Sequence, residues 1–302
     1  GSASLVLVFH NLFYPDSWWL GSASLTDASY SGVIAGNDLH MRGINGSITL
    51  KEKRSRENPL ANLMGNTLDL SKTLFQDFIS GIKKSEAADS LDLLTIDEVE
   101  YGILLFENVR AELEVDRNEL NLSRITSDFF KGKLYGDGFV KFGAESSEYN
   151  VSLAFDRISL EAISRRLSSI QDYITGKVNG LIWISGDVAG LDTVDGPFKF
   201  WSKSSSDEPR KIGKALLDKL GARERLFLGS SRSYNNGDIS GYIKSGLITF
   251  KVLDISNSFL GFRNLSIKVD DKMNSISISH LLSVIREIAR RSQTGGPTIE
   301  TN

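Results

Sequence analysis

The feature that most constrains the fold is the strict alternation in AELEVDRNELNLSRI, residues 111–125. Its first half alternates apolar and acidic side chains, which is the two-residue period of a strand with one dry face and one wet face. A two-residue turn at Arg117-Asn118 suits the hairpin, because asparagine tolerates the positive φ that such turns need. This turn predicts two apolar cross-strand pairs, Leu113 with Leu122 and Val115 with Leu120.

The same alternation returns along most of the chain. It occurs in FFKGKLYGDGFVKF (129–142), EYNVSLAF (148–155), GKVNGLIWISGDV (176–188) and TVDGPFKFW (193–201). A second hairpin is predicted in LSIKVDDKMNSISIS, where a turn at Lys272-Met273 pairs Val269 with Ile276 and Ile267 with Ile278. Hairpins that join neighbouring strands indicate an antiparallel β-meander.

The pattern divides the chain into four regions. Residues 1–53 read as short strands, and residues 54–98 as a connector that is helical in part and flexible at its ends. The helix is predicted in LSKTLFQDFISGIKK, which has Leu74, Phe75, Phe78 and Ile82 at helical spacing. Residues 99–291 return to strands, with amphipathic helices near 159–170, 210–220 and 280–291, and residues 292–302 form a polar tail that we expect to be disordered.

Composition excludes several classes of function. Lys and Arg number 35 against 38 Asp and Glu, so the chain lacks the basic surface that nucleic acid requires. It has no cysteine, which excludes disulfides, thiolate metal sites and cysteine nucleophiles. No apolar run approaches the roughly 18 residues of a membrane span. Gly1-Ser2 is typical of a pair left by cloning, which is compatible with a signal or anchor trimmed from upstream.

No motif indicates catalysis. The sequence has no nucleophile elbow, no phosphate-binding glycine loop and no dinucleotide fingerprint. The three histidines, His10, His40 and His280, have no partner at metal-ligand spacing, so we expect no metal, no cofactor and no enzymatic activity. Arginines 223, 225 and 232 flank LFLGSS and are interpreted as a solvated loop rather than an anion site.

The alternation leaves open what the dry face covers. The strands and the helix stripes can close on each other as a sandwich or barrel with a dry core. They can also remain an open sheet whose apolar face binds something else. The pattern alone does not choose between these two arrangements.

The region from residue 99 to 290 resembles the C-terminal region of AsmA-like proteins, the bacterial envelope family that includes the TamB and YdbH-type groups. The resemblance lies in LNLSRITSDFFKGKLYGDGFVKF, then SLEAISRRL, then TGKVNGLIWISGDVAGLDTVDGPFKF. The strand glycines are Gly132, Gly136 and Gly138, followed by Gly176, Gly180 and Gly186. The segments DEPRKIGKALLDKLG and NNGDISGYIKSGLITF are also similar to that family.

The resemblance implies a fold, a location and a ligand. It implies a mostly β protein, a long antiparallel meander curled into an open groove, with a few amphipathic helices. It also implies a periplasmic location in a Gram-negative bacterium, an inner-membrane anchor upstream, and phospholipid transport between the two membranes along the groove. The residues expected to line the groove are Leu113, Val115, Leu120, Leu122, Phe130, Leu134, Val140, Phe142, Val151, Leu153, Phe155, Ile182, Ile184, Phe198 and Phe200.

Two other hypotheses remain. In the first, the protein is a scaffold for envelope assembly that does not transport lipid and pairs with an outer-membrane partner, or with a further β-segment, at its sheet edges. In the second, it is a carbohydrate-active β-protein that binds sugar through exposed Trp18, Trp19 and Trp201.

Overall fold

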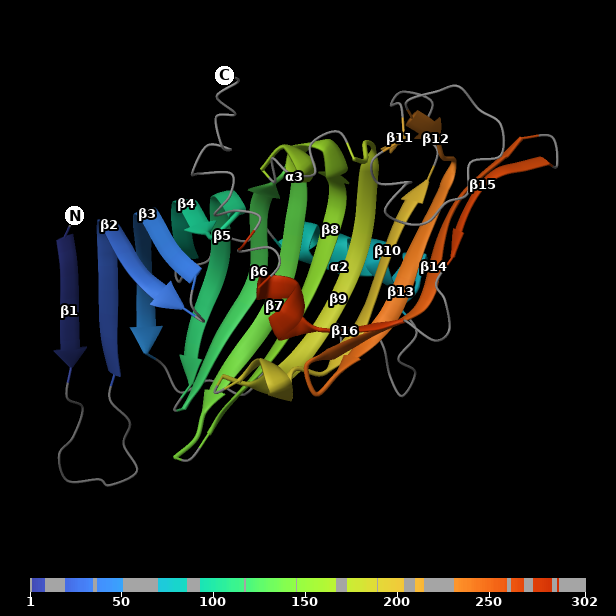
Figure 1. The fold of residues 1–302 in the computed structure, drawn as a ribbon. Helices are drawn as coiled ribbons and strands as arrows, with labels where there is room; N and C mark the ends of the chain where they lie inside the picture. Colours follow the sequence, from blue (N-terminus) through green and yellow to red (C-terminus); the bar gives the residue numbers. More distant parts are fainter. Residues whose placement is uncertain are drawn as a thin grey trace, which may run out of the picture.

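In the computed structural model, the chain is described over residues 2–8, 20–34, 37–50, 70–85, 93–116, 118–144, 146–166, 173–188, 190–203, 210–214, 231–259, 262–268, 274–283 and 287. Fourteen of the described strands form one antiparallel sheet in which nearly every strand pairs with its neighbours in sequence. The predicted meander, curled and open, is therefore the observed fold (Figure 1). The end strands β1 and β15 each pair with one neighbour within the described residues.

The strands of the large sheet lie in chain order across its width, except for the last strand, β16, which pairs with β14. They are β1 (Ser2–Val8), β2 (Leu20–Ile34), β3 (Asn37–Leu50), β4 (Leu93–Tyr101), β5 (Leu104–Asp116), β6 (Glu119–Phe129), β7 (Gly132–Phe142), β8 (Ser147–Ser159), β9 (Lys177–Asp187), β10 (Gly196–Lys203), β13 (Asn236–Lys244), β14 (Leu247–Phe259), β15 (Phe262–Lys268) and β16 (Ser275–Ser277). A second, two-stranded sheet pairs β11 (Lys211–Gly213) with β12 (Ser231–Ser233).

The first predicted hairpin is confirmed in its register. Leu113 pairs with Leu122 and Val115 pairs with Leu120 across β5 and β6. Alternation of side chains along both strands then places these apolar residues on one face of the sheet, as the sequence predicts.

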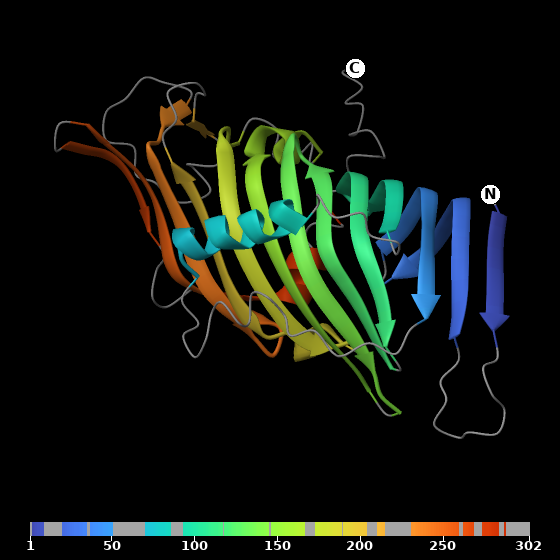
Figure 2. The same cartoon turned by 180° about the vertical axis from the view of Figure 1, so that it is seen from behind.

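The helix predicted in the connector is α2 (Lys72–Ser85), and it lies across one face of the sheet (Figures 1 and 2). We call this the outer face and define it by four buried residues that the helix covers: Tyr135, Ala154, Leu181 and Trp201. The predicted stripe of α2 packs there, with Phe75 edge-on to Trp201 at 5.0 Å between ring centroids. Ser71 caps the helix by accepting a hydrogen bond from the amide of Leu74 at 3.0 Å.

The opposite, inner face carries the predicted groove residues. At one end of the strands it is closed by the short helix α3 (Leu160–Arg166), whose Ile163 packs on Phe129, Leu134 and Ile158. Ser159 is its N-cap, as expected, because its hydroxyl accepts the amide proton of Ala162. A further helical turn, residues 278–283, lies on the side of the sheet opposite α2 in both views.

A row of β-bulges crosses the sheet and was not expected. Four residues within strands have positive φ at or beside shifts in strand register: Asp27 (48°), Asn108 (53°), Arg124 (52°) and Arg157 (57°). Each bulge adds one residue to its strand, so the parity of the inward side chains changes there. Leu122 and Ile125 consequently share the inner face, although their numbers differ in parity.

The prediction for the second hairpin is wrong. The second hairpin does not form, because Ile276 of β16 pairs with Ile248 of β14, and Ile267 of β15 pairs with Ile255 of the same strand. The thirteen-residue β14 is longer than β15, so its first residues are left free to pair with β16.

The helix expected near 210–220 does not begin where predicted, because residues 211–213 are strand β11. Ile212 is fully buried against Tyr234, the residue after β12, and the amide of Gly213 donates to the carbonyl of Tyr173. Residues 215–230 and the tail 292–302 lie outside the described part of the chain. Strand β4 begins at Leu93, inside the region interpreted as connector.

Candidate functional site

The structure brings the predicted groove residues together on the inner face, with one exception. Direct cross-strand pairs link β5 through β10: Leu113 with Leu122, Leu120 with Val140, Leu134 with Phe155, Val151 with Ile184, Leu153 with Ile182, and Ile182 with Phe198. Val115, Phe142 and Phe200 belong to the same face by register. The result is one apolar surface that runs across six consecutive strands of the meander.

The exception is Phe130, which lies in the tight turn between β6 and β7. Phe130 and Lys131 both have positive φ (42° and 61°), so the predicted long strand 129–142 is instead a turn followed by β7. The sequence reading missed Phe129, which is buried on the inner face, while Phe130 packs against it at 4.5 Å between ring centroids. Before the bulge at Arg124 the inner-face residues of β6 have even numbers, and after it they have odd numbers. Alternation counted from Leu122 therefore does not identify Phe129.

Phenylalanine rings form a row along the inner face. The centroid separations between successive rings are 4.7, 6.0, 5.7, 6.4 and 5.7 Å along the series Phe106, Phe129, Phe155, Phe200, Phe198 and Phe250. These separations lie in the range of favourable aromatic contacts. The row extends the apolar face to β14, beyond the residues predicted from the sequence. The alternation of Ile239, Gly241 and Ile243 in β13 is the sequence pattern that could have predicted this extension.

Glycines make room for this row. Gly180 on β9 lies between Phe155 and Phe200, and a Cβ at this position would lie 2.2 Å from the Phe200 ring. Gly241 on β13 lies beside Phe198 in the same way, with 2.9 Å from a Cβ to the ring and 2.0 Å to the carbonyl of Thr249. Each ring therefore lies over a neighbouring strand, which smooths the apolar surface across the sheet.

The inner face is only partly covered, unlike the surface beneath α2. Most of its lining residues are half-buried, including Val140, Leu153 and Ile182, and Phe142 at the end of β7 is 50% exposed. Phe129 and Leu134 are buried near α3, and Leu113 and Phe198 are buried elsewhere on this face. The inner face thus offers accessible apolar surface along the strands from a closed end to an open end.

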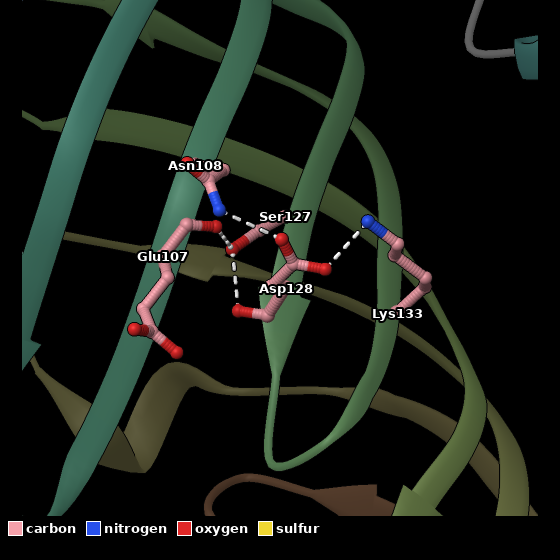
Figure 3. Close-up of polar contacts among 5 residues, drawn as sticks. All are labelled: Glu107, Asn108, Ser127, Asp128 and Lys133. Atoms are coloured by element: carbon pink, nitrogen blue, oxygen red, sulfur yellow. Dashed lines mark hydrogen bonds and ion pairs between the residues drawn. The ribbon is translucent and has the colours of Figure 1, made fainter.

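A polar cluster on β5, β6 and β7 is a second candidate site (Figure 3). The Asp128 carboxylate accepts hydrogen bonds from Lys133 Nζ at 2.5 Å and from Asn108 Nδ2 at 2.8 Å. These bonds, that of Lys133 first, lower the pKa of Asp128 below its usual value of 3.8. Ser127 donates to the backbone carbonyl of Glu107. Because Asn108 is the bulged residue, we interpret the cluster as a support for the bulge.

The other candidates contribute no site. Within the described residues no group of His, Cys, Asp and Glu could hold a metal ion. His40 contacts the Ser31 hydroxyl at 3.0 Å, and His280 lies in the helical turn 278–283. Trp201 is buried beneath α2, so it is not the exposed sugar platform that the carbohydrate hypothesis requires.

His10, Trp18, Trp19, Arg223 and Arg225 lie outside the described residues, and Arg232 is on β12. A search of the described helices for one that is long and apolar enough to cross a membrane finds none. Comparison of the chain with protein-family models, curated proteins and solved structures gives no match.

Proposed function

We propose that the protein binds phospholipid, with the acyl chains on the inner face of the sheet. The observation that carries this proposal is the continuous, half-exposed apolar surface of β5 to β10, which contrasts with the buried patch beneath α2 on the outer face. Burying one methylene contributes about 0.8 kcal/mol, so a sixteen-carbon chain has on the order of 10 kcal/mol at stake. Because the inner face is apolar over most of its width, most of this gain is kept as a chain slides along it.

The wider role follows from the family resemblance. We propose that the chain is a periplasmic segment of an envelope protein that is anchored in the inner membrane and passes phospholipid toward the outer membrane. The head group stays in water at the open side of the sheet while the acyl chains follow the Phe row. No residue is assigned a catalytic role, and no cofactor is required.

The test compares the lipid content of the purified wild type with that of two variants. One variant carries a new charge on the inner face, and the other carries it on the outer face. Native mass spectrometry and lipid extraction should find near-stoichiometric phospholipid in the wild type. Val140→Asp places a carboxylate on the inner face and should abolish this lipid. Phe139→Asp is the matched control, because Phe139 is half-buried on the same strand and faces outward.

The two variants separate a groove from a core. If both fold and only Val140→Asp loses lipid, acyl binding by the inner face is supported. A wild type that purifies without lipid and melts independently of added phospholipid would sink the proposal. The same conclusion follows if Val140→Asp unfolds and Phe139→Asp does not, because Val140 would then belong to an ordinary core.

The open edges of the sheet favour a second candidate function, the scaffold. The backbone of β15 pairs only with β14 among the described strands, so its outer edge can accept a strand of a partner. Proline at Ser266 should block such pairing without affecting the inner face. If envelope assembly in cells is lost with Ser266→Pro and retained with Val140→Asp, the scaffold function replaces lipid transport.

A further inference from the structure

A cavity on the outer face has no role in the proposed lipid binding. It lies where the chain enters α2, beside the outer surfaces of β9, β10, β13 and β14, and has a volume of about 550 Å³. Leu70 forms one wall and Pro197 another. Pockets of this size are typical of sites for small molecules. The sheet separates it from the inner face.

The cavity is positively charged. Lys199, Lys244 and Lys251 line it, against a single carboxylate, Asp195, which gives a formal charge of +2 (three positive minus one negative). Asp195 is engaged by the backbone, because it accepts the amide proton of Ser245 at 2.6 Å. In the part of the chain that the structure describes, none of the three lysines forms an ion pair with a carboxylate.

The remaining walls are aromatic and apolar. Trp183 is held in place because its indole nitrogen donates to Asn150 Oδ1 at 2.8 Å. The Nζ of Lys251 lies 5.1 Å from the centroid of the Tyr242 ring, a cation–π contact that positions this lysine at the cavity. The cavity therefore has lysines that can bind an anion, next to the apolar surface of Trp183 and Leu70.

We propose that this cavity binds a small amphiphile that carries a phosphate group. A phosphate monoester has a charge of about −1.5 to −2 at neutral pH, which matches the net charge of the lining, and lysine is a common phosphate ligand. Its short apolar part lies against Leu70 and Trp183. The site is independent of acyl binding on the inner face, because the two lie on opposite sides of the sheet.

Calorimetric titration with hexyl phosphate tests the site. Inorganic phosphate and hexanol are titrated separately, because they represent the anionic part and the apolar part of this ligand. Hexyl phosphate should bind more tightly than either half, and its affinity should fall with added salt. The double variant Lys244→Gln/Lys251→Gln should weaken binding by about tenfold, since hydrogen bonds to charged groups are lost. Both lysines are exposed, so the variant should fold. Lys141→Gln, an exposed lysine outside the cavity, should bind as the wild type does.

The proposal is overturned if hexyl phosphate binds no more tightly than inorganic phosphate. It is equally overturned if the double variant and Lys141→Gln have the same affinity for hexyl phosphate. Val140→Asp should retain hexyl phosphate binding, so failure of the inner-face proposal leaves this result unchanged.

Vesicles distinguish two sources of the phosphate. Sedimentation with phosphatidylcholine vesicles that contain phosphatidic acid, reversed by hexyl phosphate, supports the site and identifies a lipid head group. Binding of hexyl phosphate without sedimentation supports the site and identifies a soluble ligand.

Discussion

The two faces of this sheet use apolar residues in different ways. On the outer face, α2 covers Tyr135, Ala154, Leu181 and Trp201, and all four are buried. On the inner face a larger set of apolar residues spans more strands, yet most remain half-buried. The difference teaches that the stability of the sheet is concentrated beneath α2, while the inner face retains apolar surface that is available for binding.

The largest effect is expected from truncation beneath α2. Phe78 is 2% exposed, so Phe78→Ala should lower the free energy of unfolding by about 3–5 kcal/mol. Phe142 on the inner face is 50% exposed, and Phe142→Ala should cost under about 1 kcal/mol. Urea denaturation followed by circular dichroism measures both. Equal losses for the two variants would mean that the inner face is also a closed core.

A second comparison uses two glycines, one on each side of the sheet. Gly180→Ala should destabilise the protein by about 1–3 kcal/mol, because its Cβ would overlap the Phe200 ring on the inner face. Gly81→Ala, within α2, has no atom within 4 Å of the new Cβ and should stabilise the helix by about 0.5–1 kcal/mol. Thermal melts of the two variants should shift in opposite directions. A stabilising Gly180→Ala would show that the Phe row tolerates added bulk.

The smallest effect concerns pH and the polar cluster at the Asn108 bulge. The pKa of Asp128 is lowered in the folded state, so this carboxylate stabilises the protein above its unfolded pKa of 3.8. The contribution is lost as the pH falls from there through the folded pKa. Lys133→Met should raise the pKa of Asp128 toward 3.8, as measured by NMR titration of its carboxyl carbon. Lys141→Met is the control, and an equal shift in it would contradict the assignment to Lys133.

Parts of the architecture could be predicted because they depend on neighbours in the chain. The register of the β5–β6 hairpin follows from the alternation around Arg117-Asn118, and the buried stripe of α2 follows from its helical spacing. The glycines of β7 and β9 were recognised as part of a pattern. The structure gives the physical reason for one of these glycines, because Gly180 leaves space for the Phe200 ring on the next strand.

Other parts could not be predicted because they depend on distant contacts. The position of α2 on the outer face was indicated weakly by Leu181 and Trp183, which are apolar at positions where alternation predicts polar residues. The bulges at Arg124 and Arg157 have no turn residue to mark them. The cavity lysines come from three different strands, and their proximity requires the sheet.

The sequence by itself determined that this chain forms a meander whose strands each have an apolar face, because side-chain alternation is a local property of the strand. Only the tertiary structure decided which face a helix covers, where the strands bulge, and which half of β14 accepts β16. These choices depend on the free energy of packing between residues far apart in the chain, and no local period encodes it.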